Sequence, residues 1–191
     1  MRDVERAVSR AGRWLASAYA LDLDFEPGDF VIRPEAAEHE LPRDRPNPRS
    51  GLVAVEKGGV LRIGLYLDER DRDDMGTILE ETSHLVCLAW HAERDLPVSC
   101  LVLEIQADVD RFLYARACGA DPLAHFERFR WADWLDDETR ARYETAHAVA
   151  GRYCRHLARR FRRPSDTEGL LSELRRFYRS SPQAKMRRIL H

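Results

Sequence analysis

Residues 76–113, GTILEETSHLVCLAWHAERDLPVSCLVLEIQADVDRFL, decide the fold. The pattern predicts two helices joined by a short break at residues 93–97. In the first helix, one side is formed by residues at helical spacing: Ile78, Leu79, Thr82, Leu85, Val86, Ala89 and Trp90. The opposite side carries Glu80, His84, Cys87 and His91, at steps of four, three and four. These four polar side chains therefore lie on a single helix face, where they can bind one ligand together.

The second helix is apolar nearly all round, which is typical of a buried helix. Asp73 or Asp74 can cap the start of the first helix, and Pro97 can begin the second. Within the second helix, Glu104 and Asp108 lie one turn apart among apolar neighbours. A buried carboxylate is costly unless it is paired, protonated or bound to a metal ion. The sequence therefore predicts a partner for both acids, either a metal ion or some of the many arginines.

Glu80-Glu81-Thr82-Ser83-His84 resembles the H-E-x-x-H helix motif of zinc peptidases, with glutamate in place of the first histidine. In the thermolysin-like gluzincins, a further glutamate ligand follows about twenty residues later, within E-x-x-x-D on the next helix. Here Glu104 follows His84 by 20 residues, and Asp108 completes the second motif. The resemblance covers these two helices only.

The resemblance implies a divalent metal ion held by Glu80, His84 and Glu104. Residues four apart share a helix face, so Glu80 and His84 can reach one ion, and an antiparallel second helix can bring Glu104 to it. Glu81, one residue aside, takes the general-base position and can accept a proton from the attacking water. Asp108 lies behind the ligands as an orienting group.

His91, on the same face as His84, is a second candidate for an orienting role. Glutamate in place of neutral histidine adds negative charge, so it weakens the ion as a Lewis acid. It also shifts the preference from zinc towards manganese or ferrous iron. Asp108 would then face a carboxylate, an arrangement that needs a shared proton or a cation.

Two functional interpretations remain open at this point. The first is a metal-dependent hydrolase that acts on peptides or proteins. The alternative is a degenerate zincin-like protein without catalysis, with or without a bound metal ion, that acts as a binding or regulatory module. In the alternative, the glutamates are solvated helix charges, and His84 and His91 are ordinary partly buried histidines.

The fold class predicted is α+β, with a small antiparallel sheet followed by a helical bundle, as in a minimal zincin. Two alternating strands at about 51–67 flank a Glu-Lys-Gly-Gly turn and predict a hairpin. Residues 3–20 predict a helix, 30–32 a short strand, and 34–51 a polar loop. In gluzincins, a strand just before the metal-binding helix pairs with extended substrate.

Beyond Cys118 the sequence predicts only helices. They include a segment from Asp121, a long helix capped by Asp136 or Asp137, another from Ser165 or Asp166, and a last one from Ser181-Pro182. We expect residues 1–120 to form the zincin-like core and 121–191 a helical extension packed on it. His147, His156 or Tyr153 can supply a hydrogen-bond donor to a reacting carbonyl.

Composition indicates a soluble, cytoplasmic protein with a net charge of −2. The four cysteines form no C-x-x-C pair, and the N-terminus shows no signal-peptide pattern. Residues 151–191 carry a net charge of +9, and the rest of the chain carries a net charge of −11. We expect the basic segment to dock on the acidic body rather than to bind nucleic acid. No membrane partner is expected, and the sequence leaves the oligomeric state open.

Overall fold

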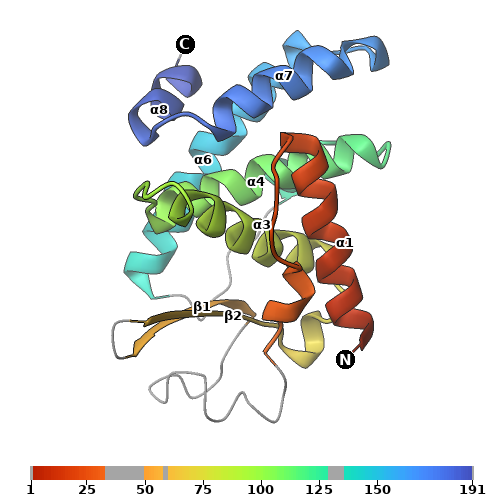
Figure 1. Ribbon diagram of the computed structural model, residues 1–191. Helices are drawn as coiled ribbons and strands as arrows, with labels where there is room; N and C mark the ends of the chain where they lie inside the picture. Colours follow the sequence, from red (N-terminus) through yellow and green to blue (C-terminus); the bar gives the residue numbers. More distant parts are fainter. Residues whose placement is uncertain (1, 33–49, 58–59, 129–135, 191) are drawn as a thin grey trace.

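The computed structural model describes residues 2–32, 50–57, 60–128 and 136–190. It is mostly helical with one small sheet, which confirms the α+β class (Figure 1). The order is α1 (Arg2–Tyr19), the short 3-10 helix η1 (Pro27–Phe30), β1 (Gly51–Lys57), β2 (Val60–Tyr66), η2 (Glu69–Asp71), α3 (Met75–Ala92), α4 (Cys100–Ala117), α5 (Ala124–Arg128), α6 (Asp137–Arg160), η3 (Pro164–Asp166), α7 (Thr167–Tyr178) and α8 (Pro182–Leu190).

The predicted hairpin is confirmed. β1 and β2 pair antiparallel, in a register that runs from Gly51 opposite Tyr66 to Lys57 opposite Val60. Leu65 and Leu67 are buried against the helices, as alternation in a half-buried strand predicts. The strand predicted at 30–32 is reduced to one parallel bridge between Val31 and Leu65, since Phe30 ends η1. The loop predicted at 34–51 lies mostly outside the described residues.

The two central helices begin at side-chain caps. Asp74 accepts hydrogen bonds from the backbone N–H groups of Gly76 and Thr77 and so starts α3. α4 begins at Cys100, three residues after Pro97, which was the predicted start. The Ser99 side chain caps it by accepting a hydrogen bond from Val102 N–H. The helices pack closely against each other, and α1 packs on α3 (Figure 1).

The helices after residue 118 pack on the same core. Asp136 caps α6 by accepting from Thr139 N–H, and α6 packs along α4. A single cluster of buried apolar side chains extends from Val4 in α1 to Ile189 in α8. The core is therefore continuous across residue 120, and the helices after it pack on the elements that precede them. Phe129, Trp131 and Trp134 lie outside the described residues.

The basic C-terminal segment contacts the end of α1. Arg175 Nε donates to the carbonyl oxygen of Ala18 at 2.9 Å, and Arg179 Nη2 donates to those of Tyr19 and Ala20 at 2.9 and 2.8 Å. α1 has no basic residue in its own last turn, so these arginines satisfy carbonyl groups at the negative end of its dipole. These contacts of the basic segment are therefore made to backbone carbonyl groups at the end of α1.

One close backbone approach fixes η1 on α1. A Cβ atom added to Gly28 would lie 2.5 Å from the carbonyl oxygen of Glu5 and 2.4 Å from Ser9 Oγ. We therefore expect Gly28→Ala to lower the free energy of unfolding by about 1–3 kcal/mol, because the backbone of α1 would have to shift. Urea unfolding measures this change. Asp29→Ala, at the exposed neighbouring position, should have a smaller effect; equal losses would contradict the explanation.

Candidate metal centre

The predicted ligands converge from two antiparallel helices. Glu80 of α3 faces Arg111 of α4. His84, one turn further along α3, faces Glu104, which lies about two turns before Arg111 in α4. One possible ligand atom from each of Glu80, His84 and Glu104 lies within 4.8 Å of the other two. The helix crossing thus brings together three side chains that lie up to 24 positions apart in the sequence.

His84 is the centre of this group. Its Nδ1 lies 3.4 Å from Oε2 of Glu81, and its Nε2 lies 3.4 Å from Oε2 of Glu104. These are ion-pair distances, yet His84 Nε2 and Glu81 Oε2 are buried and have no hydrogen-bond partner among the described residues. Burial lowers the pKa of His84, but interaction with Glu104 and Glu81 outweighs it, so the pKa stands well above its usual value. The surrounding carboxylates therefore favour a positive charge here, either on the protonated imidazole of His84 or on a bound cation.

Glu81 is buried beside His84. Burial raises the pKa of its carboxyl group, and the attraction of His84 only partly opposes this rise. The neighbouring carboxylates of Glu80 and Glu104 raise it further. A carboxyl group with a raised pKa holds a proton more readily, which suits a group that must accept one from water and release it.

Glu80 has a partner that the sequence did not single out. Arg111 Nη2 donates to Glu80 Oε2, and both side chains are largely covered. The same arginine lies close enough to Asp108 and Asp74 for their charges to raise its pKa, together with that of Glu80 and against the effect of burial. Arg111 thus fixes the Glu80 carboxylate and offsets its charge.

A tyrosine from α6 adjoins the group. Burial raises the pKa of Tyr143, and so do the negative charges of Glu104, Glu80 and Glu81. The hydroxyl therefore stays protonated and can donate a hydrogen bond. The donors considered from the sequence lie elsewhere: Tyr153 stacks on Phe177, His156 is exposed, and His147 contacts Asp108.

Asp108 belongs to a second group rather than to the ligands named above. His125 Nε2 lies 2.8 Å from its Oδ1, and His147 Nδ1 lies 3.1 Å from its Oδ2. The acid predicted to stand behind Glu104 is thus held by two histidines from α5 and α6. His91 lies outside both groups, and its Nδ1 is 2.8 Å from the carbonyl oxygen of Cys87 in the preceding turn.

The fully buried acid of α4 is Asp110. It accepts hydrogen bonds from Tyr19, from Ser83 Oγ at 2.5 Å and from Gln106 Nε2 at 2.9 Å. Lys185 Nζ of α8 donates to Gln106 Oε1 at 3.1 Å. Burial raises the pKa of Asp110 to about 6, although these donors lower it. This network, which we call the Asp110 network, ties α1, α3, α4 and α8 together.

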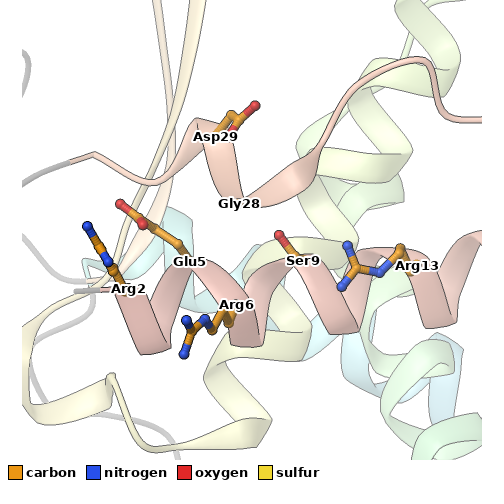
Figure 2. Close-up of a pocket in the computed structure, with 7 residues that line it drawn as sticks. All are labelled: Arg2, Glu5, Arg6, Ser9, Arg13, Gly28 and Asp29. Atoms are coloured by element: carbon orange, nitrogen blue, oxygen red, sulfur yellow. The ribbon is translucent and has the colours of Figure 1, made fainter.

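A hollow beside α1 lies apart from this chemistry. Its volume is about 360 Å³. Figure 2 shows it between α1 and η1, with Arg2, Glu5, Ser9 and Arg13 along it. It shares no lining residue with the Glu80–His84–Glu104 group. Arg13 on its wall is paired with Glu26.

Comparison with family models, with curated proteins and with solved structures finds no match to this chain. Across the described helices, none combines the length and the apolar character needed to span a bilayer. All four cysteines, Cys87, Cys100, Cys118 and Cys154, are free thiols.

Proposed function

We propose that this chain is a metal-dependent hydrolase that cleaves peptide bonds, with Glu80, His84 and Glu104 holding a divalent ion. The observation that carries the proposal is the convergence of three ligand atoms within 4.8 Å, at a buried histidine nitrogen that has no hydrogen-bond partner in the described part of the chain. Buried polar atoms are normally satisfied, so an orphaned imidazole nitrogen beside two carboxylates favours a cation.

The Glu80–Arg111 pair supports a zinc-type centre despite the missing histidine. A carboxylate and a guanidinium together carry no net charge, as a neutral imidazole carries none. Arg111 engages Oε2, and the carboxylate has a second oxygen to offer. The added negative charge that the sequence implies is therefore offset, which keeps zinc in the same range of preference as manganese or ferrous iron.

In this reaction the metal ligands, Glu81 and Tyr143 have separate roles. A divalent ion, when bound by the three ligands, polarises the carbonyl group and makes water more acidic. Glu81 accepts the proton of the attacking water and delivers it to the leaving amine. Tyr143 donates a hydrogen bond to the carbonyl oxygen as negative charge develops there.

Peptides are favoured as substrates by the position of β2. The strand directly precedes the helix that carries the ligands, with only η2 and the cap between them. One edge of β2 pairs with β1, and among the described residues the other edge has a single bridge, from Val31 to Leu65. An extended peptide can add to such an edge through backbone hydrogen bonds.

A second candidate is a scaffold of this shape that binds a partner and does not catalyse. The raised pKa of His84 favours it, since a protonated imidazole between Glu81 and Glu104 satisfies both carboxylates without an ion. This candidate predicts that His84 contributes to stability and not to metal content.

Metal stoichiometry separates the two candidates. After equilibrium dialysis against zinc or manganese, we expect His84→Ala to hold one equivalent of metal per chain less than the wild type, because the central ligand is lost. Elemental analysis measures the content. The matched control is His156→Ala, since His156 is an exposed histidine of α6. Equal metal content in wild type and His84→Ala would support the scaffold and end the hydrolase proposal.

A further inference from the structure

The second group of ligand-type side chains is assembled from three helices. Asp108 comes from α4, His125 from α5 and His147 from α6, and one ligand atom of each lies within 4.8 Å of the others. The imidazole rings of the two histidines lie edge to face, with centroids 5.1 Å apart. All three side chains are largely covered, at 15–20% exposure.

The charges around Asp108 suit a cation. Burial raises the pKa of this carboxyl group, but hydrogen bonds from His125 and His147 bring it below its usual value. The acid is thus an anion with a histidine nitrogen directed at each oxygen. An imidazole nitrogen that carries no proton can present a lone pair to the same point.

From this geometry we infer that Asp108, His125 and His147 form a second metal site, which takes a divalent first-row transition ion. Two imidazoles and one carboxylate are donors that such ions prefer, whereas calcium and magnesium prefer oxygen alone. The inference goes beyond the proposed hydrolase and stands without it, since the two groups share no residue.

The position of α5 indicates what the ion would do. α5 has five residues, too few for a helix to be stable by itself. It is held by Phe126, whose ring packs on His147 and lies 3.0 Å from where a Cβ atom of Gly151 would be. An ion bound through His125 would join α5 to both long helices. The second site is therefore structural, and it stabilises the folded state when occupied.

Cobalt(II), a spectroscopic probe for such ions, tests the inference in the full chain carrying His84→Ala. That background removes the first site, so the two proposals fail separately. We expect a saturable visible absorbance at one equivalent of cobalt and a rise in melting temperature with added zinc. Absence of both would overturn the second site and leave the hydrolase proposal untouched.

Substitution by glutamine separates ligation from hydrogen bonding. Adding His125→Gln or His147→Gln keeps an amide that can donate to Asp108 but removes a good metal ligand. We expect each to weaken cobalt binding at least about 10-fold, since losing a ligand costs no less than losing an orienting group. His156→Gln is the control and should bind as the background does. Far-UV circular dichroism checks folding.

If a glutamine variant fails to fold, the chain that carries His84→Ala alone still provides a test. Imidazole nitrogen resonances of His125 and His147 should shift on zinc addition in a His84→Ala sample, while that of His156 should not. Unshifted resonances at His125 and His147, or cobalt binding unchanged by both glutamine variants, would show that the cluster is a hydrogen-bonded tie between helices only.

Discussion

Replacing Glu81 by Gln is expected to lower peptide hydrolysis at least about 100-fold while metal binding remains. Glutamine preserves the shape of the side chain but cannot accept the proton of the attacking water. Glu81 is suited to that task because burial raises its pKa and because its Oε2 has no hydrogen-bond partner among the described residues. The assay is digestion of a mixed peptide library with added zinc, manganese or ferrous iron, followed by mass spectrometry.

The control is Glu93→Gln, at an exposed glutamate just beyond the end of α3. It should cleave at the wild-type rate. Tyr143→Phe is the companion variant, and it should lower the turnover rate more than the affinity, because its hydrogen bond strengthens as the oxyanion forms. Cleavage that persists unchanged in Glu81→Gln would remove Glu81 from the mechanism. No cleavage by the wild type with any of the metals would favour the non-catalytic scaffold.

The central part of the candidate site could be predicted because it depends on local periodicity. Glu80 and His84 share a helix face at any tertiary arrangement, and the apolar faces of α3 and α4 require that the two helices pack. Once the break at 93–97 makes them antiparallel neighbours, Glu104 meets His84. The motif spacing and the helix geometry therefore give the same three residues.

The partners of Asp108 could not be predicted in the same way. Helical spacing predicts which side chains of one helix lie close together. His125 and His147, however, come from two other helices, α5 and α6. Their approach depends on where the turn after α4 places α5, and no periodic pattern encodes that turn. The sequence did show that Asp108 lies among apolar residues. Because burying an unpaired carboxylate is costly, this predicts that Asp108 has a partner, but it does not identify the residue.

Asp110 was missed for a related reason. α4 is apolar nearly all round, so the sequence pattern does not show which of its polar side chains is most deeply buried. The family resemblance points to Glu104 and Asp108 only. The pattern that distinguishes Asp110 is spatial: Tyr19, Ser83 and Gln106 all direct polar atoms to it. Lys185, one of only two lysines in the chain, completes the network through Gln106.

Replacing Asp110 by Ala is expected to lower the free energy of unfolding at pH 7 by about 3–5 kcal/mol, the usual effect of removing one member of a buried charged network. The loss would leave the hydroxyl groups of Tyr19 and Ser83 without their acceptor and Lys185 without a nearby opposite charge. Urea unfolding at constant pH measures the change. Asp121→Ala, at an exposed acid beyond α4, should have a much smaller effect.

The pH dependence of stability is an independent test of the burial of Asp110. In the folded chain the pKa of Asp110 is about 6, above its ordinary value of 3.8, so between these values the folded state binds the proton more readily than the unfolded state. The contribution of this group to stability therefore falls as pH rises from about 4 to about 6, by an amount on the order of 3 kcal/mol. Asp110→Asn, which cannot ionise, should lack this fall, so its stability relative to the wild type should improve with rising pH across that window. Urea unfolding of both proteins at pH 4, 5, 6 and 7 compares them, and parallel pH profiles would contradict burial of an ionisable Asp110.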